Sequence, residues 1–299
     1  MNDTKERKRK KGLFIFLCAD IFLLLVFIIT MMPFTKKTSA PSVKSAVLNV
    51  NKIPEIASIT FSENDEDGEM QKVTLEKNGG FWVGTDSSTG KKWPADNQNV
   101  ATLLDKCSQI VNVYTAASTK DAWESFGLGE ESAFKLGFYD GSGKIITEIF
   151  FGKSDYLTSR AAFRVHGKET VFQTDISIKS YLSASASFWA DPFVYPQALT
   201  GYTRMKSESL LRHGALVDFN AAGKQPDYTF RKDFENGSSA RFLIYKSDMQ
   251  SESLYNIVPF FIAGPSADAD EKKAVESFNY AYTMSQWTLE KFSEEVVQQ

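Results

Sequence analysis

Few residues in this 299-residue chain have the type and spacing that catalysis or metal binding needs. The two histidines, His166 and His213, lie far apart in the sequence, so they do not form the close pair with which helices bind zinc. Cys107 is the only cysteine after the N-terminal apolar segment, so it has no second cysteine there for a shared metal or a disulfide. No phosphate-binding loop and no serine-nucleophile motif occurs. We therefore expect no catalytic residue, no metal site and no cofactor.

Carboxylates are numerous, but spacing sets no pair of them apart from ordinary surface charge. Residues 63–68 are an acidic run that resembles a calcium loop but lacks the twelve-residue ligand spacing and the closing glutamate, so we interpret it as a solvated hairpin tip. The tryptophans could stack on a glycan, although large aromatic residues more often fill a core. They are Trp82, Trp93, Trp123, Trp189 and Trp287.

The N-terminus has the pattern of a membrane anchor. Residues 1–12 hold six Lys or Arg and two Asp or Glu, and the apolar run that follows contains one charged residue, Asp20. About twenty apolar residues in a helix match the thickness of a bilayer, and basic residues hold their end of a span in the cytoplasm. We predict a transmembrane helix over 13–34, with the rest of the chain extracytoplasmic. A cleaved signal peptide and a lipoprotein signal are the alternatives.

Asp20 is the one residue of the predicted span with a possible functional role. An ionised carboxylate is costly inside a bilayer, so such residues commonly contact a partner or carry protons. We favour a contact with a partner helix over a proton relay.

Beyond the span the composition predicts a folded, net-acidic region. The chain is 42% hydrophobic and 13% aromatic, which favours a packed core over disorder. A net-acidic region without a basic stripe gives no support for nucleic-acid binding. We expect a linker over 35–50, a first domain over 51–199 and a second module over 200–299.

Alternating apolar residues and turn signals predict antiparallel hairpins, and changes of periodicity predict helices between them. The hairpin strands are expected around 56–61 and 73–75, at 134–139 and 145–151, and at 162–165 and 170–173. An amphipathic helix of about fourteen residues should begin after Asp96, a good N-cap, and 176–187 should also be helical. The fold class is therefore α+β, antiparallel hairpins with packed helices.

The last hundred residues have the order of elements of a degenerate second copy. Strand patterns at 227–231, 241–245 and 255–258 precede Pro265 and Asp268 and then a helix expected through Val275, Phe278 and Tyr282. The first module likewise has strands, then Pro94 and Asp96, then a helix. Residue identity between the two is thin, so a true duplication stays open.

Several short motifs together resemble a known bacterial family. They are Trp93-Pro94-Ala95-Asp96, Val100-x-x-Leu103-Leu104, Phe126-Gly127-Leu128, Phe150-Phe151-Gly152 and Phe188-Trp189-x-Asp191. In this order they resemble domain-of-unknown-function family 4340 over roughly residues 55–195. Trp93 and Phe126 stand where the family commonly has tyrosine. The motifs are structural, a helix start, a turn and an aromatic corner, so we take Trp93, Pro94, Asp96, Gly127, Leu128 and Gly152 as structural candidates.

The resemblance implies a membrane-anchored extracytoplasmic protein whose genes often lie beside those of a gliding-motility-type ABC transporter. It brings no catalytic residues. We therefore expect a non-enzymatic auxiliary subunit whose partners are an ABC transporter permease or associated envelope proteins. An anchored envelope hydrolase acting on glycan or peptide, and a surface ligand-binding or adhesive module, are the alternatives.

Overall fold

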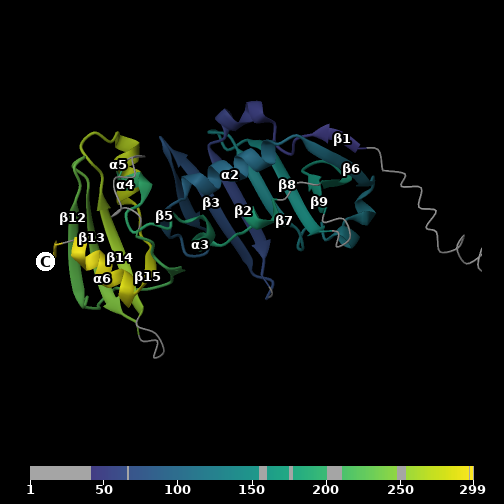
Figure 1. The fold of residues 1–299 in the computed structure, drawn as a ribbon. Helices are drawn as coiled ribbons and strands as arrows, with labels where there is room; N and C mark the ends of the chain where they lie inside the picture. The colour runs from purple at the N-terminus through teal and green to yellow at the C-terminus, as the bar shows by residue number, and fades with distance from the viewer. Residues whose placement is uncertain are drawn as a thin grey trace, which may run out of the picture. The chain divides into compact units, whose positions relative to one another are not determined.

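The computed structural model describes residues 42–65, 67–154, 160–174, 178–200, 211–247, 254–295 and 297–298. Residues from Pro41 onward form one compact unit, which combines two antiparallel β-sheets with short helices (Figure 1). The predicted basic arm, the predicted span with Asp20 and most of the predicted linker lie outside the described residues. Within those residues, no helix has the length and apolar character needed to cross a membrane.

The larger sheet has ten strands in the order β1-β6-β10-β9-β8-β7-β2-β3-β4-β5. Its strands are β1 (Ser42–Ser45), β2 (Ser58–Asn64), β3 (Met70–Asn78), β4 (Phe81–Asp86), β5 (Lys92–Pro94), β6 (Val111–Ala117), β7 (Phe134–Tyr139), β8 (Ile145–Ser154), β9 (Ala161–Val165) and β10 (Val171–Thr174). The β2–β3, β7–β8 and β9–β10 pairs confirm the predicted hairpins. The alternation of apolar and polar residues explains these hairpins. Ile59 and Phe61 on β2 face the core, and so do Leu136 and Phe138 on the neighbouring strand β7.

One helix, α2 (Asn97–Ser108), begins at the predicted place. The Asp96 carboxylate caps it by accepting from the N–H groups of Gln98 and Asn99. Val100, Leu103 and Cys107 are wholly buried in the core of the large sheet. Burial raises the pKa of the Cys107 thiol to about 12, so this cysteine is a small apolar core residue, as the sequence indicated.

The opposite face of the large sheet has a second, smaller core. It contains Leu128, Ala133, Phe150, Ala162 and Val171, covered by the segment with the short 3-10 helices η2 (Lys120–Ala122) and η3 (Glu124–Phe126). Arg164 packs against this core. It is a charged residue, yet only 3% of its surface is exposed. Its guanidinium lies 3.9 Å from the ring centre of Trp123 and 3.5 Å from that of Phe150, and it donates to Leu128 O and Glu130 Oε1.

The smaller sheet has six strands in the order β11-β15-β14-β13-β12-β16. Its strands are β11 (Leu216–Val217), β12 (Tyr228–Asp233), β13 (Ser239–Lys246), β14 (Leu254–Ile262), β15 (Ala281–Ser285) and β16 (Val297–Gln298). Helices α5 (Ala269–Glu276) and α6 (Gln286–Glu295) accompany it. Aromatic residues dominate its core: the rings of Phe242 and Phe292 lie 4.8 Å apart at nearly right angles, and both contact Tyr195.

Three sequence expectations need correction. Phe278 and Tyr282 are not helical, because α5 ends at Glu276. Tyr282 lies on β15, paired with Ile257 of β14. Residues 178–187 form only the 3-10 helix η4 (Lys179–Tyr181) and the start of α3 (Ala186–Trp189), since the serines there favour turns and caps over a long helix. Part of the predicted linker belongs to the fold: β1 pairs with β6, and η1 (Val50–Glu55) follows it.

The proposed second copy matches the first in element order but not in strand pairing. In both halves a run of antiparallel strands precedes an aspartate-capped helix: β2 to β5 before Asp96 and α2, and β12 to β14 before Asp268 and α5. The strand after the helix differs, however. In the second half β15 pairs with β14, whereas β6 pairs with β1 and β10 at the far end of the large sheet.

Candidate functional site

The short motifs singled out from the sequence contact one another in two pairs. The first pair joins residues 93–96 to residues 188–191, which continue from α3. Asp96 N donates to Trp189 O at 2.8 Å, and Asp191 N donates to Pro94 O at 2.8 Å. Ala95 and Ala190 form an antiparallel bridge between them. Pro94 and Asp96 therefore join the start of α2 to the segment that leads into the smaller sheet.

The second pair joins Phe126-Gly127-Leu128 to Gly152. Gly127 has a φ of 65° and ends η3 in the left-handed conformation that glycine adopts without strain. A β-carbon built on Gly152 would lie 2.1 Å from Phe126 O, so the backbones approach too closely for any side chain. Leu128 is wholly buried in the smaller core. Positive φ at Gly127 and close backbone approach at Gly152 are two roles that suit glycine.

Trp93 fills the space that Gly84 leaves open. The two residues are paired across β4 and β5, and a β-carbon on Gly84 would lie 1.8 Å from the indole. Trp93 has no exposed surface, which supports the core interpretation over glycan stacking. Its Nε1, however, has no hydrogen-bond acceptor among the described residues.

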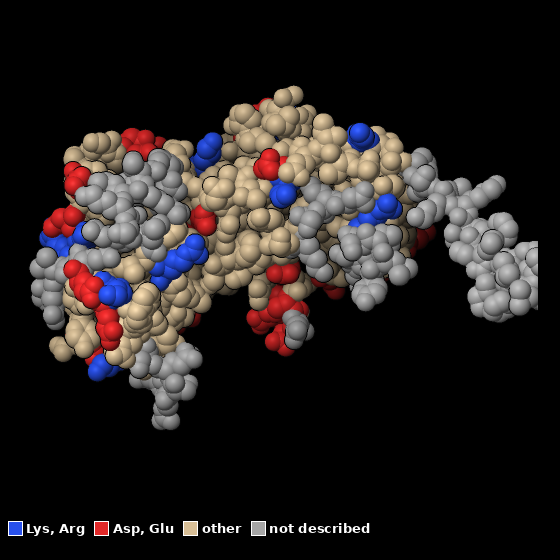
Figure 2. All heavy atoms as spheres, in the orientation of Figure 1, with Lys and Arg blue, Asp and Glu red and all other residues tan. Residues whose placement is uncertain are grey.

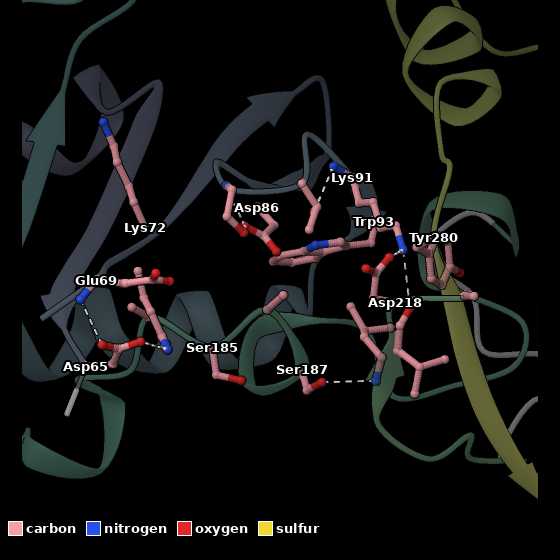
Figure 3. Close-up of a pocket in the computed structure, with 18 of the residues that line it drawn as sticks. Asp65, Glu69, Lys72, Asp86, Lys91, Trp93, Ser185, Ser187, Asp218 and Tyr280 are labelled. Carbon is pink, nitrogen blue, oxygen red and sulfur yellow. Dashed lines mark hydrogen bonds and ion pairs between the residues drawn. The ribbon is translucent and has the colours of Figure 1, made fainter. Parts of the chain in front are cut away.

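Trp93 also lies in the wall of a cleft of about 380 Å³ that residues of both sheets line (Figure 3). The large sheet contributes the start of β3 and the β4–β5 turn, and the first turn of α3 adds Ser187 and the N-cap residue Ser185. The smaller sheet contributes β11, and the residues around Tyr280 lead into β15. The candidate functional site is this cleft.

The charged residues of the cleft are held by specific partners. The Lys91 ammonium donates to Asp218, so a charge from each half meets here. Asp86 accepts from the N–H of Ser88 at 2.8 Å and from its hydroxyl at 2.7 Å. Partial burial raises the pKa of the Asp86 carboxyl, but hydrogen bonds from Ser88 and Thr89 outweigh this effect and hold the pKa below its ordinary value. Asp86 is therefore an ionised acceptor near neutral pH.

Tyr280 and Ser187 form the wall on the side of the smaller sheet. Burial, followed by the nearby Tyr282 and Asp191, raises the pKa of the Tyr280 phenol well above its ordinary value, so it stays neutral. Ser187 Oγ accepts from Leu216 N at 2.9 Å, which joins α3 to β11 and leaves the hydroxyl hydrogen to donate elsewhere.

Asp65, at the edge of the cleft, belongs to the acidic hairpin tip. Its carboxylate accepts from the N–H groups of Asp67 and Glu69, which is the geometry of a turn. No group of three or more His, Cys, Asp or Glu residues in the described part of the chain could hold a metal ion. On the face drawn in Figure 2, basic and acidic side chains are interspersed, without a basic stripe.

A second surface feature is an apolar groove of about 500 Å³ at the β1 end of the large sheet, which we call the β1 groove. Val43 on β1 and Val113 on β6 are register partners in it, and Phe163 and Phe172 lie beside them on β9 and β10. Val43 is 68% exposed, so apolar surface faces solvent here.

Sequence reasoning found the structural motifs but not the cleft. Asp86 and Lys91, which flank one turn, lie far in the sequence from Ser187 and Asp218, and only folding brings these positions together. The Asp-x-Ser turn at Asp86 was the one local signal, and it marks a turn rather than a ligand site. Asp20 lies outside the described residues, so its role stays a prediction.

Comparison with known proteins gives one match. The family model described as "Domain of unknown function (DUF4340)" matches residues 82–256. The chain matches no curated protein and no solved structure.

Proposed function

The chain belongs to the DUF4340 family, and on that premise we propose that it is a membrane-anchored auxiliary subunit of an ABC-type transport or cell-envelope complex. In this proposal the folded region is extracytoplasmic and non-enzymatic and works through contacts between proteins. The basic arm and apolar segment of the sequence support the anchor.

The observation that carries the proposal is the β1 groove. Apolar surface in contact with water is unfavourable. Burying it against a partner contributes a favourable free energy of about 25 cal/mol per Å² of apolar surface. Val43, Val113 and Phe172 come from three neighbouring strands and line the same groove. Such a surface suits an apolar polypeptide segment better than it suits a polar solute.

The position of the groove in the chain indicates which partner covers it. Seven residues, 35–41, separate the predicted span from β1, and seven residues reach at most about 25 Å when extended. With the span in a bilayer, the groove would stand near the membrane surface. We therefore commit to one occupant, an extracytoplasmic segment of an integral membrane partner such as a permease.

Crosslinking in intact cells tests this proposal. A photoreactive amino acid at Val43 should give a discrete adduct with an integral membrane protein. The matched control is the same substitution at Ile262, which is 58% exposed on the smaller sheet and does not line the groove. The proposal fails if Val43 gives no adduct, if Ile262 gives the same adduct, or if the captured protein is not part of a transporter or envelope complex.

The hydrolase alternative gains no specific support from the cleft. Glycan hydrolysis needs a carboxyl group that stays protonated near neutral pH and can act as an acid. The Asp86 carboxyl has the opposite shift, since its pKa is lowered. The auxiliary-subunit proposal is therefore the one we develop.

A further inference from the structure

The lining of the cleft carries a formal excess of negative charge, with four acidic residues against two lysines. Lys91 is paired with Asp218, and Asp65, Glu69, Lys72 and Asp86 leave a net charge of −2. An anionic ligand would therefore be repelled, and a ligand that is only a cation would offer no acceptor to the N–H of Trp93. A neutral ligand with many hydroxyl groups would find both donors and acceptors, because each hydroxyl can donate one hydrogen bond and accept two.

The cleft offers those donors and acceptors at fixed positions. The Asp86 carboxylate is ionised and held by hydrogen bonds from Ser88 and Thr89, and a ligand hydroxyl would add to these bonds or replace one of them. Opposite it, Ser187 is fixed as an acceptor by Leu216 N and keeps its hydrogen for donation. Groups held in this way lose little freedom when a ligand binds.

The indole of Trp93 gives an independent indication of a ligand. Its Nε1 is a wholly buried donor with no acceptor among the described residues, and such donors are rare in folded proteins. In Figure 3 the indole lies between Asp86 and Lys91 in the cleft wall. A ligand hydroxyl would supply the missing acceptor. Since the indole has no exposed surface, the wall must adjust as the ligand enters, and this would change tryptophan fluorescence.

We propose that the cleft binds a neutral, hydroxyl-rich ligand of mono- or disaccharide size through Asp86, Ser187 and the N–H of Trp93. A volume of about 380 Å³ lies in the range of small-molecule sites. This binding activity goes beyond the proposed function and does not depend on it, because the cleft and the β1 groove share no lining residue.

The test uses the purified full-length chain in a detergent whose head group is not a sugar. Maltose and the disaccharide of N-acetylglucosamine are titrated by calorimetry and by tryptophan fluorescence, with spermidine and citrate as charged probes. We expect saturable binding of at least one disaccharide with a fluorescence change. The absence of saturation by either disaccharide up to roughly 10 mM, or tighter binding of spermidine or citrate, would overturn the proposal.

Two aspartates provide a matched pair of variants. Asp140, in the β7–β8 turn, accepts from the N–H of Ser142 at 2.9 Å and from its hydroxyl at 2.7 Å, which nearly repeats the turn of Asp86. Asp140 does not line the cleft. Asp86→Asn and Asp140→Asn should therefore alter stability alike, but only Asp86→Asn should weaken disaccharide binding, by about tenfold. Equal affinity in the two variants would contradict the proposal.

Trp93→Phe tests the indole donor separately. It keeps an aromatic ring over Gly84 but removes the N–H, so the disaccharide should bind more weakly to a variant that still unfolds cooperatively. If Trp93→Phe does not fold, the Asp86 and Asp140 pair still decides the proposal.

Discussion

At the scale of single residues, the surroundings of His213 act on its protonation in opposite directions. Its Nδ1 lies 2.6 Å from Gly214 O and its Nε2 lies 2.8 Å from Asp191 O, while its ring stacks on Tyr282 at 4.2 Å. A neutral imidazole has one N–H and can satisfy only one of these carbonyl groups. Burial nevertheless lowers the pKa of His213 from 6.5, against the opposing effect of the two carbonyls.

This lowered pKa predicts a loss of stability in acid. The unfolded chain takes up the proton near pH 6.5 and the folded chain only at lower pH, so the stabilisation is complete above pH 6.5 and falls as the pH drops. The contribution of one group changes by at most about 1.4 kcal/mol per pH unit. His213→Gln should therefore flatten the pH dependence of the thermal midpoint between about pH 7 and pH 5.

The control for this prediction is His166→Gln. His166 is 58% exposed in the β9–β10 turn, where its Nδ1 lies 2.9 Å from Glu148 Oε2, so its surroundings differ from those of His213. This variant should keep the acid sensitivity of the original chain. If His213→Gln keeps it too, the sensitivity comes from other groups.

At the scale of elements, the contact between Gly152 of β8 and residues 126–127 attaches β8 to the segment that covers the smaller core. In Gly152→Ala the added methyl group would lie 2.1 Å from Phe126 O, and backbone cannot move aside as a flexible side chain can. We expect a loss of about 2 kcal/mol or more of unfolding free energy, measured by denaturant titration.

Gly141, in the turn between β7 and β8, provides the matched control. The nearest atom to a β-carbon built there is Ala57 Cβ at 4.0 Å, so there is room for a methyl group. Gly141→Ala should change stability by less than about 0.5 kcal/mol. Similar losses in both variants would show that the close approach at Gly152 is not the cause.

The elements that the sequence predicted correctly are those whose signals are local. Hairpins follow from alternation and turn residues, and Asp96 marks the start of α2 because a cap acts within three residues. Tyr282 was assigned to a helix because its spacing from Phe278 suits one, but pairing with β14 decides its conformation. The cleft was invisible for the same reason, since the contact of Lys91 with Asp218 is tertiary.

At the scale of the whole molecule, the two sheets belong to one folded unit. Asn279 N donates to Lys92 O at 3.0 Å, and the Asn279 side chain accepts from Lys92 N, so β5 is bonded directly to the segment before β15. The family match over 82–256 likewise crosses the boundary predicted at 199–200. A chain that ended at residue 199 would lose Asn279 and the cleft residues that the smaller sheet contributes.

Topology is the remaining question for the whole chain, and the sequence predicts an N-terminus in the cytoplasm and a compact unit outside. The basic arm precedes the apolar run, and the next apolar stretch, 258–263, is far too short to span a bilayer. In the structure residues 258–262 lie on β14, paired with β13, which accounts for their apolar character within a sheet.

Protease accessibility decides the topology. Protease added to intact spheroplasts should remove the region from residue 42 onward, while an epitope tag fused before Met1 survives on a small membrane-bound fragment. After lysis the tag should be digested as well, which shows that the membrane had protected it. Digestion of the tag in intact spheroplasts, with the compact unit protected until lysis, would reverse the orientation. The β1 groove would then face the cytoplasm, and an extracytoplasmic partner could not reach it.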